Sequence, residues 1–103
     1  MIVKYTYLRY NEFVRLDLFL KATKLVKRRA VARQLCEGGR VLVNGYESKP
    51  SKVVKRGDVL LVLFASNNLK IEIIDIPFSH KNVDAASLYR VDAETSRTRQ
   101  DNS

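Results

Sequence analysis

Two segments in the first half of the chain carry apolar residues at the spacing of a helix. In residues 15–22, Leu16, Phe19 and Leu20 stand at positions i, i+3 and i+4, which predicts a short helix with one buried stripe. The same period returns from residue 27 or 28 to residue 37 and predicts a second helix. The apolar side of this helix is expected to consist of four residues: Val31, Ala32, Leu35 and Cys36.

A strand pattern replaces the helical one after Gly38-Gly39, a pair that ends a helix because glycine tolerates positive φ. Residues 40–45 alternate into a brief strand that closes on an Asn44-Gly45 turn. Turn chemistry at residues 56–58 then introduces the apolar run of residues 59–65. A second strand is therefore expected in this run.

Asn67-Asn68 interrupts the apolar run and predicts a hairpin across the two asparagines. The partner strand carries Ile71 and Ile73 and extends toward Ile76. The pattern up to this point predicts an α+β fold, with two short helices on a small, mostly antiparallel sheet.

The last quarter of the chain is expected to add a short C-terminal helix over residues 79–94, starting near Asn82 or Asp84. Residues 95–103 hold no large apolar side chain and are expected to be disordered. At 103 residues, the chain is long enough for one domain with a modest core and too short for two.

Positive charge is concentrated in one part of this domain. The chain holds 19 Lys and Arg against 11 Asp and Glu, a net charge of +8. Residues 15–56 contain 12 of the basic side chains and 3 of the acidic ones, so this segment carries +9 and the rest about −1. Such asymmetry indicates a polyanionic partner, of which nucleic acid is the commonest soluble one.

Several other classes of function lack their usual signals. One Cys and one His form no metal cluster, and no cofactor motif is present. No apolar run reaches the 18 or so residues of a membrane span, and the N-terminus lacks a signal-peptide pattern, so a cytoplasmic protein without a membrane partner is expected. Asp17, Asp58 and Asp75 fall on unrelated elements without a His or Lys at catalytic spacing, which argues against an enzyme.

Cations gather at the start of the predicted second helix, where the helix dipole disfavours them by roughly 0.3–1 kcal/mol each. Lys27, Arg28, Arg29 and Arg33 lie there, and Arg29 and Arg33 share a face because they are four residues apart. A phosphate backbone would compensate for this cost, because guanidinium groups and helix N-terminal amides bind the same anion.

Six short elements occur in the order found in a known family of RNA-binding domains. They are Arg-Leu-Asp at 15–17, the basic helix start, Gly-Arg-Val at 39–41, Val-Asn-Gly at 43–45, Ser-Lys-Pro-Ser at 48–51 and Gly-Asp at 57–58. In this combination the chain resembles the small domain typified by ribosomal protein S4, also known as the αL motif. The resemblance implies structured-RNA binding by a domain over residues 15–78.

The resemblance extends to stand-alone members of the family, the ribosome-associated quality-control P factors and the small heat-shock ribosome-recycling proteins, through Ala85, Ala86 and Tyr89. It implies a monomeric, non-catalytic factor that binds rRNA and tRNA on the large ribosomal subunit and assists C-terminal tailing of stalled nascent chains by a partner protein. A heat-shock factor that recycles large subunits with trapped peptidyl-tRNA is the alternative. The absence of a longer basic C-terminal extension favours the P factors. A basic adaptor for an acidic protein is the alternative of another class.

The charge pattern and the resemblance together predict nine RNA-binding residues: Arg15, Lys21, Lys27, Arg28, Arg29, Arg33, Arg40, Lys49 and Lys52. Arg15 alternatively pairs with a local carboxylate. Asp17 is expected to be structural, either a helix cap or the partner of an arginine. Gly39, Asn44 and Gly45 are expected to set the backbone of loops.

Two features depart from the family pattern. Alanine occupies position 30, where relatives often have a hydroxyl side chain at the helix start. Residues 1–14 precede the Arg-Leu-Asp element, and they are either an N-terminal extension from a mis-assigned start, with Val14 as the true first codon, or a strand or stacking arm with Tyr5, Tyr7 and Tyr10.

Overall fold

The structure, a computed structural model, describes residues 13–77 and 84–96. Its elements follow the α+β order expected from the sequence. They are β1 (Val14–Arg15), α2 (Leu16–Ala22), α3 (Arg29–Glu37), β2 (Val41–Val43), β3 (Tyr46–Glu47), β4 (Val53–Val54), β5 (Val59–Leu63), β6 (Asn67–Ile73), the 3₁₀ helix η1 (Ala85–Leu88) and β7 (Tyr89–Ser96).

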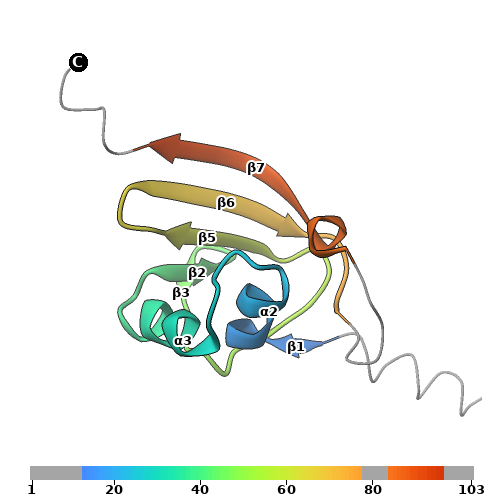
Figure 1. Cartoon of the computed structure of the whole chain (residues 1–103), viewed down its shortest axis with the longest axis horizontal. Coiled ribbons are helices and arrows are strands. Elements are labelled where there is room, and N and C mark those ends of the chain that lie inside the picture. Colours follow the sequence, from blue (N-terminus) through green and yellow to red (C-terminus); the bar gives the residue numbers. More distant parts are fainter. Residues whose placement is uncertain (1–12, 78–83, 97–103) are drawn as a thin grey trace, which may run out of the picture.

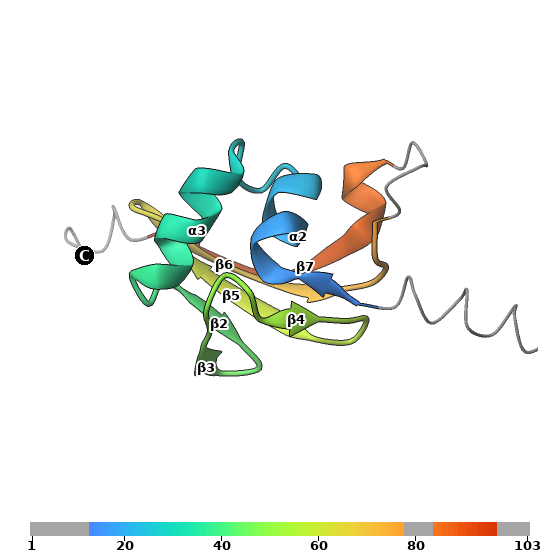
Figure 2. The ribbon, with the colours of Figure 1, turned by 90° about the horizontal axis from the view of Figure 1, so that it is seen from below.

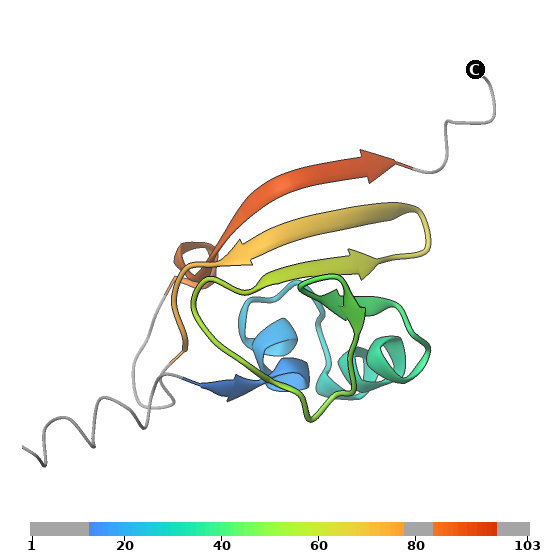
Figure 3. The ribbon, with the colours of Figure 1, turned by 180° about the vertical axis from the view of Figure 1, so that it is seen from behind.

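The strands form two antiparallel sheets. Five strands pair in the order β3-β2-β5-β6-β7, and β1 pairs with β4 through Val14 opposite Val54. Helices α2 and α3 lie on one face of the five-stranded sheet (Figure 2). In Figures 1 and 3, which show opposite sides, β7 is the edge of the sheet farthest from the two helices. The helices therefore gather over the β2 and β5 half of the sheet.

The core lies between α2 and the sheet. Leu16, Phe19 and Leu20 of α2 are fully buried, as their spacing predicted. Alternate residues of β5 and β6 meet them from the sheet, since side chains along a strand point to opposite faces. The buried members of these two strands are Leu60, Val62, Leu69, Ile71 and Ile73.

Helix α3 buries a narrower stripe than its sequence predicted. Ala32 and Cys36 are buried and Leu35 packs partly against the core, but Val31 is 42% exposed. The cause is position, because α3 packs mainly against α2 and makes few contacts with the sheet. Val31 therefore lies outside the core.

The predicted turns at Gly38-Gly39 and at Asn44-Gly45 are confirmed. Gly38 caps the C-terminus of α3, and Gly39 follows with φ of +75°. Asn44 and Gly45, between β2 and β3, have φ of +52° and +90°, the positive pair of a type I′ hairpin turn. Local residue chemistry was therefore sufficient to locate these turns.

The predicted hairpin between β5 and β6 exists, but its turn is not at the asparagines. Leu63 pairs with Asn68, and Phe64 N donates to Asn67 O at 2.8 Å, so the chain reverses at residues 65 and 66. Asn67 begins β6, where its side-chain amide donates to Glu94 of β7 at 3.1 Å. A cross-strand partner thus accommodates a residue that usually favours turns.

Within the described residues 84–94, the predicted C-terminal helix over 79–94 is wrong except for one turn. Helix η1 covers four residues, capped by Asp84, whose carboxylate accepts from Ala86 N at 3.3 Å. Strand β7 follows and pairs antiparallel with β6, with a bulge opposite Lys70 and Ile71. Without β7, β6 would be an unpaired edge strand.

Three sequence predictions fall partly or wholly outside the described residues. The prediction that residues 95–103 are disordered is wrong at residues 95 and 96, which belong to β7. Residues 97–103 are not described. The alternatives for the first segment concern residues 1–12, also not described, but Val14 lies in β1, so the boundary at 14/15 divides a strand. The boundary at 78/79 falls in the undescribed range 78–83. In the described ranges, no helix is long and apolar enough to cross a membrane.

Candidate nucleic-acid interface

The start of α2 is built around a buried carboxylate. Asp17, in the first turn of this helix, has a fully buried side chain. Arg15 donates to it twice, from Nε to Oδ1 and from Nη2 to Oδ2, both at 3.1 Å. Arg29, the first residue of α3, places Nη2 3.4 Å from Oδ1 and Nε 3.2 Å from Oδ2. Asp17 therefore joins a strand and two helices through two arginines, a group that we name the Asp17 cluster (Arg15, Asp17 and Arg29).

The cluster remains positively charged. Burial alone would raise the pKa of Asp17, but hydrogen bonds from Arg15 and Arg29, together with their charges, outweigh burial and hold this pKa below its usual range. The hydrogen bond to Asp17 raises the pKa of Arg15. One carboxylate faces two guanidinium groups, whose side chains are 47% and 38% exposed. An anion in solvent thus meets two arginines held in fixed positions.

These contacts decide the role of Asp17, which the sequence left open. Asp17 is the partner of two arginines, because the capping position of α2 is Arg15, whose side chain makes no capping hydrogen bond. Arg15 does pair with a local carboxylate, and half of its side chain still faces solvent. Arg29 was expected on an open cationic face, but its ion pair with the buried Asp17 makes it part of the fold as well.

The loop between β3 and β4 is attached to the same helix start. Leu16 N donates to Lys52 O at 2.8 Å, and Asp17 N donates to Pro50 O at 3.1 Å. Two amides at the N-terminus of α2 therefore bind the chain's own loop. At its other end the loop reaches the C-terminus of α3, where Lys49 and Pro50 line a hollow with Cys36 and Gly39.

The other predicted cations surround this arrangement at exposed positions. Lys21 lies in the last turn of α2, and Lys27 and Arg28 directly precede α3. Arg33 lies one helical turn after Arg29, on the same side of α3. The two helices, which pack against each other, therefore carry most of the predicted RNA-binding residues.

Arg40 is separated from the Asp17 cluster. It follows the C-terminal end of α3, whereas Arg29 begins that helix. Its Nη1 donates to Leu63 O at 3.3 Å, and its own carbonyl accepts from Leu63 N at 2.8 Å. Arg40 therefore fastens the start of β2 to the end of β5, and the structure does not bring it to the same anion as Arg29.

A second buried carboxylate, missed by the sequence reasoning, locks the β2–β3 turn. Asp58 accepts from Asn44 Nδ2 at 3.1 Å, from Lys55 N at 2.9 Å and from Lys55 Nζ at 3.3 Å. Burial acts to raise the pKa of Asp58, but these hydrogen bonds hold it below its usual range. Asn44 Oδ1 in turn accepts from Val59 N at 2.9 Å. The signal was present in the sequence, because this contact joins the Val-Asn-Gly and Gly-Asp elements.

Two other side chains with reactive groups, Cys36 and Asp75, take part in the core and in an ion pair. Burial, followed by the charges of Asp17 and Glu37, raises the pKa of the Cys36 thiol to about 11, so it stays protonated within the core. Asp75, considered for catalysis, pairs with Arg56 at 3.0 Å. In the part of the chain that the structure describes, no group of three or more His, Cys, Asp and Glu is placed to hold a metal ion.

Comparison with known proteins matches the part of the chain that carries this site to one family of domains. Residues 14–60 match the S4 domain, a range that contains the Asp17 cluster, both helices and the Asn44 turn. In a solved trimeric structure of Vibrio cholerae heat shock protein 15, 84% of the chain aligns with 80% of this one, with a TM-score of 0.72 and 37% identity.

Relatives of known name extend the match beyond the domain. The RQC P-site tRNA stabilizing factor of Halalkalibacterium halodurans is 41% identical over 81 residues, which cover 79% of this chain and 92% of the relative. The factor of the same name from Bacillus subtilis is 36% identical over 78 residues, 76% of this chain and 91% of the relative. Heat shock protein 15 of Escherichia coli is 36% identical over 88 residues, 84% of this chain and 66% of the relative.

Proposed function

The chain belongs to the family of the RQC P-site tRNA stabilizing factors, built on an S4 domain, and on this premise we propose that it binds rRNA and tRNA on the large ribosomal subunit. The Asp17 cluster carries this proposal. It holds two half-exposed guanidinium groups in fixed positions beside the exposed cations of α2, α3 and the β3–β4 loop. Preorganised guanidinium forks suit the paired oxygens of phosphate.

The nine predicted residues divide into two groups within this proposal. Arg15 and Arg29 present guanidinium groups that the buried Asp17 orients. Lys21, Lys27, Arg28, Arg33, Lys49 and Lys52 supply exposed charge around them. Arg40 lies beyond the C-terminal end of α3. It contributes less to phosphate binding, because its guanidinium group already donates a hydrogen bond to Leu63 O.

The proposed role is in ribosome-associated quality control, where the protein stabilises tRNA on a large subunit with a stalled chain and so assists C-terminal tailing by a partner protein. Its support is the name of the relatives that share more than nine-tenths of their length with this chain. The heat-shock alternative rests on the match to heat shock protein 15. Adding the protein and the partner protein to purified large subunits with trapped peptidyl-tRNA separates the two roles, because only a factor that assists tailing increases the extension of the nascent chain by the partner.

The proposal includes a monomer, as the sequence predicted. A related heat shock protein 15 is described as trimeric, so the mass of the protein in solution must be measured by light scattering, both alone and with RNA. A cytoplasmic location follows from the proposed partner, and no catalytic step is part of the proposal.

Sedimentation with purified large subunits tests the interface directly. Arg33→Ala should weaken binding about tenfold, since a charge-assisted contact to phosphate is worth about 1.5 kcal/mol. The matched control is Lys70→Ala, which removes one exposed cation from β6, a strand away from the helices. Equal binding of the two variants would contradict the proposal. Tighter binding to an acidic protein than to RNA would favour the adaptor instead.

A further inference from the structure

The β2–β3 hairpin presents an aromatic side chain to solvent. Tyr46 is 77% exposed, more than any other large apolar or aromatic side chain in the described part of the chain. Tyrosine rings usually bury much of their surface in a core or an interface. The position of Tyr46, at the first residue after a tight turn, is set by its neighbours rather than by packing of its ring.

The backbone under Tyr46 is rigid. Asn44 and Gly45 adopt the positive φ angles of the turn, and Asn44 is bonded on both sides, to Asp58 and to Val59 N. Ser48 Oγ donates to Tyr46 O at 2.9 Å. A ligand that meets the ring therefore finds it on a backbone that is already ordered, which lowers the entropy cost of binding.

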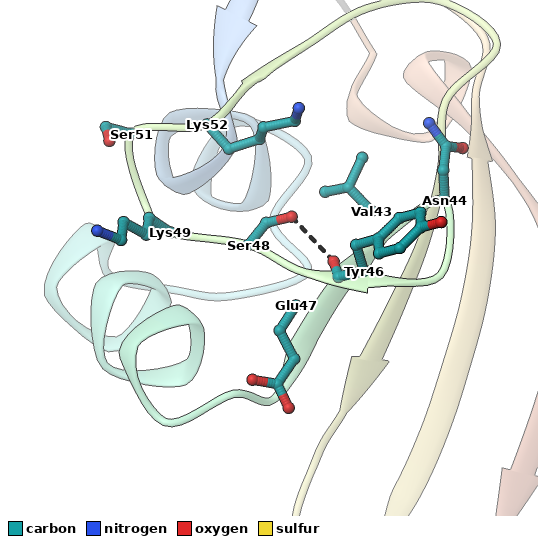
Figure 4. A pocket seen from close by; sticks show the side chains of 8 residues that line it. All are labelled: Val43, Asn44, Tyr46, Glu47, Ser48, Lys49, Ser51 and Lys52. Carbon is teal, nitrogen blue, oxygen red and sulfur yellow. Dashed lines mark hydrogen bonds between the residues drawn. The ribbon is translucent and has the colours of Figure 1, made fainter.

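A hollow of about 560 Å³ lies beside the ring, within the range of small-ligand sites. Its lining includes Tyr46, Glu47, Lys49 and Lys52 (Figure 4). In Figure 4 Lys52 extends over the hollow, whereas Lys49 points the other way, across α3. The carboxylate of Glu47 points away from both lysines and lies against Gly39, about 3.1 Å from where a Cβ would be placed. The hollow thus combines an aromatic wall with flanking positive charge.

We propose that Tyr46 stacks on an unpaired base of the bound RNA while Lys52, which extends over the hollow beside the ring (Figure 4), binds an adjacent phosphate. This inference rests on the proposed function and narrows it, because a base within a duplex cannot offer its face to the ring. Stacking on an aromatic side chain tolerates any base, so Tyr46 distinguishes looped or single-stranded RNA from a duplex without reading its sequence.

A fluorescent variant tests the stacking directly. The chain contains no tryptophan, so Tyr46→Trp introduces a single reporter. An RNA hairpin with an unpaired loop should quench its fluorescence, and a blunt duplex of equal length should not. Val91→Trp, a change at an exposed position of β7, is the control, and its fluorescence should not respond to either RNA.

Affinity measurements separate stacking from charge. Tyr46→Ala should bind the looped RNA about tenfold more weakly, as expected for one lost base stack, and the duplex as well as wild type does. Tyr46→Phe should retain wild-type affinity, because it keeps the ring. If Tyr46→Ala binds both RNAs like wild type, or loses affinity for both equally, the inference is wrong. Loss of binding by Arg33→Ala in the same assay would still support the proposed function, whereas a wild-type protein that binds neither RNA would refute both.

Discussion

At the residue scale, Asp17 serves both the fold and the proposed interface. Its buried carboxylate holds the start of α2 to the start of α3 through Arg15 and Arg29. Asp17→Asn removes the charge that both guanidinium groups need and should lower the free energy of unfolding by about 2 kcal/mol or more, the scale for hydrogen bonds to charged groups. Urea denaturation measures this loss. Asp75→Asn, at an exposed ion pair with Arg56, should change stability by less than about 0.5 kcal/mol. Equal losses of stability in the two variants would show that the burial of Asp17 contributes nothing to the free energy of unfolding.

The same carboxylate predicts an acid limit to stability. The pKa of Asp17 is lower in the folded protein than its ordinary value, so near pH 4 the unfolded chain binds more protons than the folded one. The contribution of Asp17 is therefore present above its ordinary pKa and is lost as pH falls through the lowered one. Melting temperatures between about pH 2 and 7 should fall more steeply at acid pH for wild type than for Asp17→Asn. Asp58, whose pKa is also lowered, should leave part of the acid slope in the variant, so parallel curves would contradict a role for Asp17.

Substitutions of Arg29 and Arg33 should differ in their effect on the stability of the protein, although the sequence placed both residues on one cationic face. Arg29→Ala leaves the buried Asp17 with one arginine instead of two and should lower the free energy of unfolding by about 1–2 kcal/mol. Arg33→Ala removes an exposed side chain and should stay within about 0.5 kcal/mol. Both changes should weaken RNA binding. Thermal unfolding of the two variants side by side checks this, and equal melting temperatures would mean that the ion pair of Arg29 is energetically unimportant.

At the scale of elements, features coded by neighbouring residues were predictable and features set by a distant partner were not. The period of Leu16, Phe19 and Leu20 located α2, and the Asn44-Gly45 chemistry located its turn. Strand β7 was not predicted, because its conformation depends on pairing with β6. The turn between β5 and β6 also lies two residues before the asparagines that were expected to form it. The charge pattern predicted the cations of the proposed interface, but the ion pair of Arg29 with Asp17 depends on the packing of α2 against α3 and could not be predicted from that pattern.

The β2–β3 turn offers a test at this scale. Asn44 combines a positive φ with hydrogen bonds to Asp58 and Val59. Asn44→Gly keeps the backbone angle and loses the hydrogen bonds, whereas Asn44→Ala loses both. The alanine variant should therefore unfold more easily than the glycine variant by about 1 kcal/mol, the preference of the left-handed region for glycine. Chemical denaturation measures the order, and an alanine variant as stable as the glycine one would show that φ at Asn44 is not a constraint.

At the scale of the whole molecule, positive charge is concentrated in one half of the protein. Exposed cations predominate on α2, α3 and the β3–β4 loop, whereas β6 and β7 carry Glu72, Asp92 and Glu94 beside two cations, Lys70 and Arg90. Arg90 pairs with Glu72 and Asp92. A polyanion is therefore attracted to the helical side. Under the proposed function, we expect this charge distribution to orient the protein on RNA before any specific contact forms, with the β7 edge directed away from the RNA.

This field predicts a steep dependence of RNA affinity on salt. If the helical side contacts about six phosphates, release of their counterions should weaken binding roughly a thousandfold between about 50 and 200 mM salt. Removing one phosphate contact with Arg33→Ala should reduce the slope of log affinity against log salt by about 1. Lys70→Ala, which lowers the net charge equally from the sheet side, should leave the slope unchanged. Titrations of one RNA at several salt concentrations give these slopes. A flat response in wild type would mean that phosphate contacts do not drive binding, and an equal change in both variants would mean that net charge, and not the helical surface, sets the affinity.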